Sequence, residues 1–303
     1  MRIEMSNEVA DAVAAGRPVV ALESTLLAHG FPPGDNLSIA RRLEEVVRAE
    51  GAVPATIAVL SGTPTVGLTG DQIHALCTGD DVVKLSTRDL GPAVALGRTG
   101  ATTVASTSAL AHATGIRVFA TGGLGGVHRP VGDSQVSWDV SADIDALATT
   151  GVLVVSSGVK SVLDVPATLE ALETRSVPVV GYRTDDFPAF YLRSSGHRVS
   201  WRVESPAEAA AVFAAHSRIS SSGMLLANPV PADAEMDHEL HERLLREAMT
   251  LLHDRSVQGS DVTPAMLEHF HRASEGVSVR VNEALVLVNA RLAAQVAVAL
   301  AGH

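Results

Sequence analysis

Two lysines are candidate nucleophiles, and the chain contains no others. Among its 23 Lys and Arg residues only Lys84 and Lys160 are lysines, and each lies at or just after an apolar run. A lysine amine can form an imine with a carbonyl, which arginine cannot, and burial after Val152–Ser156 would favour the neutral form of Lys160. Alternatively, this lysine extends to the surface or pairs with a carboxylate. The sequence therefore predicts nucleophilic chemistry at Lys160 and leaves that alternative open.

A glycine-rich segment at 119–129 follows another apolar run and ends in His128 and Arg129. Glycines let backbone N–H groups approach an anion without a Cβ atom in the way, and a His-Arg pair adds donors or positive charge. The pattern predicts a phosphate-binding turn. The same glycines could instead serve close packing at a tight corner, and that alternative also stays open.

Three acidic residues could transfer protons or hold a metal ion. Glu23 follows the apolar run Pro18–Leu22 and could be a general acid or base, or simply a carboxylate in the first turn of a helix. Asp139 and Asp143 are four residues apart at a predicted helix start, which could bring both carboxylates to one site. A hard divalent ion that keeps several waters suits so few oxygen ligands, but two aspartates at a helix N-terminus need no metal.

Alternating strands and helices position these residues. Short runs rich in Val, Ile and Ala are typical of strands buried on both faces. The predicted strands are Pro18–Leu22, Thr56–Leu60, Val82–Leu85, Arg117–Thr121, Val152–Ser156 and Pro178–Gly181. Helices are predicted at 37–50, from a capping box at Thr69–Gln72, and from Ser141 or Ala142 to Leu147. The alternation predicts an α/β fold with a mostly parallel central sheet, helices on both faces, and ligands at the carboxyl ends of the strands.

The last third of the chain is predicted to be mainly helical. After about residue 205 we expect three long amphipathic helices, at 237–254, 263–275 and 279–301. Asn282 and Asn289 lie two turns apart on one face of the last helix, and we interpret them as partners in helix-to-helix hydrogen bonds. No linker or break in composition divides the chain, so the sequence predicts a single domain spanning 1–303.

Composition restricts the class of protein. The 303 residues are 46% hydrophobic with a mean hydropathy of +0.22, and the net charge of −11 argues against nucleic acid as a partner. No uninterrupted apolar run reaches the ~18–20 residues of a membrane span, and the first residues lack the apolar core of a signal peptide. Cys77 is the only cysteine, which excludes an intrachain disulfide. We therefore expect a cytoplasmic protein that contacts no membrane.

Several long motifs match a known family in order along almost the whole chain. They are 21–30 (ALESTLLAHG), 51–58, 84–90, 100–104, 119–129, 139–143, 158–164, 187–190 and 227–231. On these motifs the chain resembles the pseudouridine-5′-phosphate glycosidase family, of the indigoidine synthase A-like group. The resemblance implies a three-layer α/β/α subunit, assembled as a homotrimer. It also implies an enzyme that uses Mn²⁺ to cleave pseudouridine 5′-phosphate reversibly to uracil and ribose 5-phosphate.

The resemblance further implies roles for individual residues. Lys160 would be the nucleophile, Glu23 the proton donor and Asp139 the metal ligand. The implied substrate contacts are Lys84, Val104, Ser141, Ala142, Asp143, Thr121, His128 and Asn289. Such chemistry suits these residue types, because a C–C glycoside has no heteroatom leaving group to protonate, whereas a lysine imine at C1′ supplies an electron sink.

The chain departs from the family pattern near the predicted site. Three extra residues separate Arg129 from Asp139, Ser156-Ser157-Gly158 replaces Cys-Ala-Gly, and a basic residue expected near Ser260 is absent. These changes favour retained handling of ribose 5-phosphate over retained recognition of uracil. The alternative hypothesis is therefore a C-glycosynthase, a class within this family that attaches ribose 5-phosphate to an aromatic polyketide acceptor. A non-catalytic sugar-phosphate sensor is a remote third, because a sensor does not need a nucleophile at Lys160.

Overall fold

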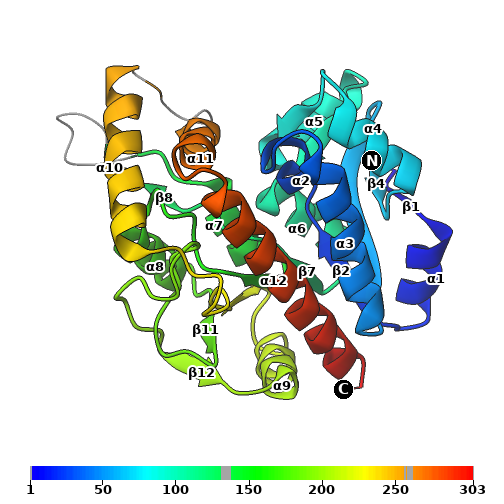
Figure 1. Cartoon of the computed structure of the whole chain (residues 1–303). Coiled ribbons are helices and arrows are strands. Elements are labelled where there is room, and N and C mark those ends of the chain that lie inside the picture. Colours follow the sequence, from blue (N-terminus) through cyan, green and yellow to red (C-terminus); the bar gives the residue numbers. More distant parts are fainter. Residues whose placement is uncertain (1, 131–137, 256, 258–261, 303) are drawn as a thin grey trace.

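A large, mostly parallel sheet forms the centre of the computed structural model, which describes residues 2–130, 138–255, 257 and 262–302 (Figure 1). Its main path is β1 (Glu4–Met5), β4 (Thr63–Val66), β3 (Val53–Leu60), β2 (Val19–Leu22), β7 (Val118–Ala120), β9 (Leu153–Ser156), β13 (Met224–Ala227), β11 (Val179–Tyr182) and β12 (Trp201–Val203). β5 (Val83–Leu85) pairs with β6 (Gly100–Thr102), which joins β3, and a separate ribbon pairs β8 (Val127–His128) with β10 (Leu163–Asp164). Within the large sheet, β3 is antiparallel to β4 and β6, and the other pairs are parallel.

The central strands are almost entirely apolar because helices cover both of their faces. Every residue of β2, β9 and β13 is buried, as expected for strands inside a parallel sheet. All six predicted strands are present, and β3 begins at Val53, three residues before the predicted start at Thr56. Apart from this start, each predicted strand end lies within one residue of the observed end.

Helices pack on both faces of the sheet and give three layers (Figure 1). They are α1 (Asn7–Ala14), α2 (Thr25–His29), α3 (Asp35–Ala49), α4 (Gly70–Thr78), α5 (Thr87–Ala95), α6 (Val104–Ala113), α7 (Ala142–Thr149), α8 (Val165–Thr174), α9 (Pro206–His216), α10 (His238–Asp254), α11 (Val262–Ala273) and α12 (Val277–Ala301). On one face α12 packs against α3, α9 and strands β2, β7 and β9, and on the other α6 packs against α5, α7, β2 and β3. The predicted α/β/α fold is confirmed, and the capping box at Thr69 and Gln72 opens α4 as expected.

The C-terminal helix α12 is the longest apolar element that the structure describes. By length and composition it could cross a membrane, the one such helix among the described residues. Here its buried face packs on the sheet and carries the polar side chains of Ser278, Asn282 and Asn289. A core helix of this kind satisfies the same criterion as a membrane span, and α12 is the central helix of its layer.

The prediction that the chain beyond residue 205 is mainly helical is confirmed, but it did not include the strand β13. This strand of four residues lies between β9 and β11 in the middle of the sheet. So short an apolar run gives no clear signal beside long helices. Gly223 precedes it, where an added Cβ atom would lie 2.3 Å from the carbonyl oxygen of Val152 on the neighbouring strand segment. The close approach of two backbones explains the glycine.

The topology brings the candidate residues to one edge of the sheet. Because β2, β7, β9 and β13 are parallel neighbours, their carboxyl ends lie side by side. The turns after β7 and β9 are joined by hydrogen bonds from the Ser157 N–H to the Gly122 oxygen (2.8 Å) and from the Leu124 N–H to the Gly158 oxygen (3.0 Å). The two turns therefore form one connected platform.

Candidate active site

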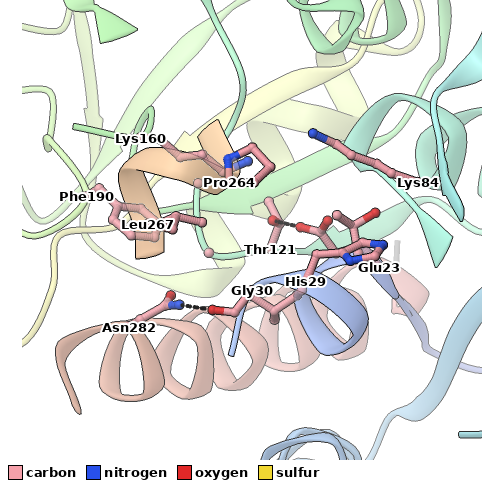
Figure 2. A pocket seen from close by; sticks show the side chains of 14 residues that line it. Glu23, His29, Gly30, Lys84, Thr121, Lys160, Phe190, Pro264, Leu267 and Asn282 are labelled. Carbon is pink, nitrogen blue, oxygen red and sulfur yellow. Dashed lines mark hydrogen bonds between the residues drawn. The ribbon is translucent and has the colours of Figure 1, made fainter. Parts of the chain in front are cut away.

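A pocket, partly open to solvent, lies over this platform (Figure 2). Glu23 reaches it from the end of β2, Thr121 from the end of β7, Lys160 from the turn after β9 and Lys84 from β5. The other lining residues are Thr25, Leu26, His29, Gly30, Gly122, Gly123, Phe190, Pro264, Leu267 and Asn282. Two lysines and one carboxyl group therefore share a single cavity whose walls are largely apolar.

Glu23 is a buried acid, with 7% of its surface exposed. Burial raises its pKa, while the positive charge of Lys160 and a hydrogen bond from the Thr121 hydroxyl oppose that rise. The hydroxyl donates to Oε1 and fixes the orientation of the carboxyl group (Figure 2). A carboxyl group with a raised pKa that also faces a cation can hold a proton and then release it, as a general acid must.

Lys160 is half-buried, so the burial predicted from the apolar run before it is partial. Its backbone N–H donates to the Leu124 oxygen at 3.1 Å, which holds the residue against the glycine turn. Two residues earlier, Gly158 adopts a φ of +76°, and an added Cβ atom there would lie 1.9 Å from the carbonyl oxygen of Pro188. Only glycine fits this position, and the resulting tight turn directs the chain toward Lys160.

Lys84 lies at the opposite side of the pocket from Lys160 (Figure 2). Its charge lowers the pKa of His29, although burial of the imidazole is the larger cause of that shift. Lys84 also opposes the raised pKa of Glu23. The second lysine therefore provides positive charge at the pocket mouth, where an anionic group could be bound.

Asp143 joins three elements instead of facing the pocket. It is buried, its Oδ1 accepts a hydrogen bond from the Ala105 N–H at the start of α6 (2.9 Å), and its Oδ2 accepts one from the Gly125 N–H (2.8 Å). Ser141 is the N-cap of α7 and accepts from the Asp143 N–H at 3.2 Å. The resemblance implies that Val104 and residues 141–143 contact the substrate. Val104 is 1% exposed, and neither Val104 nor residues 141–143 line the pocket.

Close packing explains the second half of the glycine turn. A Cβ atom on Gly125 would lie 2.3 Å from the Ser141 hydroxyl oxygen, and one on Gly126 would lie 2.4 Å from that of Thr168. The N–H groups at 124, 125 and 127 all donate to protein oxygens. Because these donors are already used, the packing alternative accounts for this part of the turn, while Gly122 and Gly123 line the pocket.

Asp139 and Asp143 have different partners in the structure. Asp139 lies beside His128, with its Oδ2 3.8 Å from Nδ1, and 40% of its side chain is exposed. Burial lowers the pKa of His128, and the Asp139 carboxylate opposes that shift. Across the described part of the chain, no three His, Cys, Asp or Glu side chains form a metal-binding group. The partly exposed carboxylate of Asp139 fits a hard ion that keeps most of its waters. Both oxygens of Asp143 accept hydrogen bonds from N–H groups.

The two asparagines of α12 have different surroundings, which the sequence did not distinguish. Asn289 is fully buried and bonded to the strand ends, so it does not line the pocket. Asn282 does line it, donates to the Gly30 oxygen at 3.5 Å, and has an Oδ1 without a hydrogen-bond partner among the described residues (Figure 2). The interpretation of Asn289 as a helix-to-helix partner is wrong because its amide reaches turns of the sheet.

Two further lining residues, His29 and Phe190, were not singled out by their chemistry. His29 ends α2, and its only signal was its place in the matched motif at 21–30. Phe190 has a φ of +61°, a strained conformation for a residue with a side chain, and its ring packs against Gly123. The extra residues between Arg129 and Asp139, and the position of Ser260, lie outside the described residues.

The family model described as indigoidine synthase A like protein matches residues 8–299. The chain belongs to this family. The pseudouridine-5′-phosphate glycosidase of Salinispora tropica is 54% identical to this family member, covering 98% of this chain and 91% of the relative. The glycosidase of the same name from Herpetosiphon aurantiacus is 52% identical, covering 99% and 98% of the two chains.

Two solved structures resemble the chain over almost its full length. The prealnumycin C-glycosynthase AlnA, in complex with ribulose 5-phosphate, has a TM-score of 0.90 and 38% identity, covering 99% of this chain and 97% of the other. An indigoidine synthase A-like protein from Thermotoga maritima has a TM-score of 0.89 and 36% identity, covering 99% and 96%. The proteins similar to this chain therefore include some named as glycosidases and one named as a C-glycosynthase.

Proposed function

We propose that this protein reversibly cleaves the C–C glycosidic bond of pseudouridine 5′-phosphate, with water, to give uracil and ribose 5-phosphate. The observation that carries the proposal is the pairing of Lys160 with a protonatable, buried Glu23 in one pocket. The chain that holds this pair is 54% and 52% identical to two proteins named for the reaction. A lysine amine and a carboxylic acid suit a C–C glycoside, for which acid-assisted hydrolysis by two carboxylates is a poor route.

Lys160 acts as the nucleophile. Its amine forms a bond to C1′ of the ribose as the bond from C1′ to the ring oxygen breaks. The nitrogen lone pair then forms a C=N bond while the bond from C1′ to C5 of the base breaks, and the electron pair passes to C5, which takes up a proton. Water hydrolyses the resulting imine, which releases ribose 5-phosphate and restores the amine.

Glu23 supplies the proton for ring opening. Burial keeps its carboxyl group protonated to higher pH, and the Thr121 hydroxyl orients it. After it donates to the departing ring oxygen, the nearby charges of Lys160 and Lys84 stabilise the carboxylate. The carboxylate can then take up the proton that the Lys160 amine loses after its attack and pass it to C5 of the base.

Asp139 is the residue we assign to Mn²⁺, with His128 beside it at 3.8 Å. When bound, the ion would orient and polarise oxygen atoms of the substrate or water. Asp143 would keep its structural contacts with Ala105 and Gly125. We therefore assign the Asp139 carboxylate to the metal and the Asp143 carboxylate to the fold.

A C-glycosynthase is the second candidate function, and a specific feature favours it. A small apolar pocket adjoins Lys160 and is lined by Ser161, Val162, Phe190, Tyr191, Met266, Leu267 and Phe270. The rings of Tyr191 and Phe270 stack there with centroids 5.4 Å apart. Such a surface could accept an aromatic ring, and the similar structure of AlnA carries a C-glycosynthase name.

One experiment separates these functions. Purified protein with Mn²⁺ is given pseudouridine 5′-phosphate, and uracil is measured by chromatography. We expect uracil release. Coupling of ribose 5-phosphate to an aromatic acceptor without uracil release would instead establish the glycosynthase. Neither reaction, with ribose 5-phosphate still bound, would support the sugar-phosphate sensor.

A further inference from the structure

Asn289 uses its whole amide group inside the protein. Its side chain is 0% exposed. Nδ2 donates to the Thr121 oxygen at 2.8 Å and to the Ser157 hydroxyl at 3.1 Å, and lies 3.4 Å from the Gly122 oxygen. Oδ1 accepts from Nδ2 of Asn228 at 2.9 Å. No polar atom of this amide is left to bind a substrate.

These four partners belong to three neighbouring strand ends. Thr121 and Gly122 follow β7, Ser157 follows β9, and Asn228 follows β13. Asn228 is itself 9% exposed and held by a hydrogen bond from its N–H to the Ser156 oxygen at 2.8 Å. One side chain from α12 therefore ties together the ends of β7, β9 and β13.

The tied segments carry the two reacting groups. The hydroxyl of Thr121 orients Glu23, and the turn that begins at Ser157 leads to Lys160. A shift of either segment would change the distance between acid and nucleophile. Small misplacements of reacting groups can cost about 10²-fold in rate.

We infer that the buried pair Asn228 and Asn289 is a positioning device that sets the separation of Lys160 from Glu23. This inference rests on the proposed function of those two residues. The pair acts through the backbone and touches no substrate. It therefore replaces the implied role of Asn289 as a substrate contact.

Substitutions at the pair can test this assignment. Asn289→Asp keeps the shape and the acceptor for Asn228 but removes both donors and sets an oxygen against the Thr121 carbonyl. Asn228→Ala is the milder variant and keeps the test available if Asn289→Asp does not fold. Gln295→Ala is the matched control. Gln295 is another amide of α12, but its Nε2 donates to Glu50 and not to a residue at the ends of β7, β9 or β13.

For pseudouridine 5′-phosphate we expect kcat to fall at least ~10-fold in both Asn variants, with KM changed by less than ~2-fold. Gln295→Ala should keep both constants. The double variant Asn228→Ala/Asn289→Ala should lose less than the product of the single losses, because the two side chains act as one unit. A rise in KM at unchanged kcat would overturn the inference and make Asn289 a substrate contact.

A measurement without substrate keeps this test separate from the proposed function. Hydrogen exchange of the ligand-free protein should be faster in both Asn variants at 121–126 and 157–162, and unchanged in Gln295→Ala. Unchanged exchange at these segments would contradict the positioning role. An inactive wild-type protein with the expected exchange pattern would count only against the proposed function.

Discussion

Glu23 is buried and Glu44 is half-buried; both carboxylic acids have raised pKa values, but only Glu23 lines the pocket. Burial is the largest cause in each case, and each accepts a hydrogen bond from a threonine hydroxyl, Thr121 or Thr56. Glu44 is therefore a natural control for Glu23. Comparing the two separates the effect of a carboxyl group with a raised pKa on stability from its effect on catalysis.

We predict that Glu23→Gln lowers kcat at least ~100-fold yet raises the melting temperature at pH 7–8. The pKa of Glu23 is raised in the folded protein, so its protonated carboxyl group makes its full contribution to the free energy of unfolding below the ordinary pKa of glutamate. That contribution is lost as the pH rises through the pKa of the folded protein. Glutamine cannot ionise, so the advantage of the variant should grow with pH across that window. Glu44→Gln should gain stability in the same way and keep full activity. Scanning calorimetry from pH 4 to 8 measures the melting temperatures of both variants, and uracil release measures their activities. Equal activity losses in the two variants would contradict the account.

Asp139 and Asp143 give a second paired prediction. Asp139→Asn should raise the Mn²⁺ concentration needed for half-maximal activity at least ~10-fold with little change in melting temperature, since this side chain is 40% exposed. Asp143→Asn should instead destabilise the fold by ~1–3 kcal/mol, because its amide sets a donor against the N–H of Ala105 or Gly125. Titration of Mn²⁺ and thermal melts measure the two effects. A higher Mn²⁺ requirement in Asp143→Asn, with lower stability in Asp139→Asn, would instead show that Asp143 binds the metal.

At the scale of elements, the turn after β9 is the most constrained part of the site. Gly158 and Gly196 have nearly equal φ values, +76° and +78°, but a Cβ atom would meet the Pro188 oxygen at 1.9 Å in the first and nothing within 4 Å in the second. Gly196→Ala should therefore cost ~1 kcal/mol and keep activity. Gly158→Ala should be much less stable and inactive, because the backbone must move two residues before Lys160. Melting curves and uracil release test the pair, and equal melting temperatures would contradict this explanation.

Strand patterns predicted the elements that carry Glu23, Thr121 and Lys160, because buried parallel strands are continuous apolar runs. β13 was missed, since its four residues resemble a fragment of the helices around it. The choice between Asn282 and Asn289 could not be predicted either. Both lie on one face of α12, and only packing against α2 or the strand ends decides which amide reaches the pocket.

The glycine turn shows the same limit at the level of local backbone. Its glycines were compatible with anion binding or with packing, and the neighbours that decide between them are distant in sequence. Ser141 and Thr168 fill the space beside Gly125 and Gly126. Long-range contacts of this kind are not encoded in a local motif.

At the scale of the whole molecule, the sheet topology explains why the position of the candidate active site could be predicted from the sequence without knowing the side-chain contacts. Parallel neighbours end at the same edge, so residues after β2, β7 and β9 had to meet. Assembly is a separate matter, because subunit contacts depend on exposed surface. We propose the homotrimer that the family resemblance implies.

Light scattering after size exclusion tests the assembly. We expect a mass three times the 31.4 kDa of the chain. The mass should not change between Gln295→Ala and the wild-type protein, because Gln295 bonds within its own chain. A monomer or dimer at micromolar concentration would contradict the trimer without affecting the assignment of Lys160.

The central claim is that Lys160 forms an imine with the sugar. Protein incubated with ribose 5-phosphate and borohydride, then digested and examined by mass spectrometry, tests it most directly. We predict a reduced sugar-phosphate adduct on the peptide that contains Lys160, none on the peptide that contains Lys84, and none in Lys160→Ala. An adduct on Lys84 alone, or no adduct in an enzyme that releases uracil, would contradict the account.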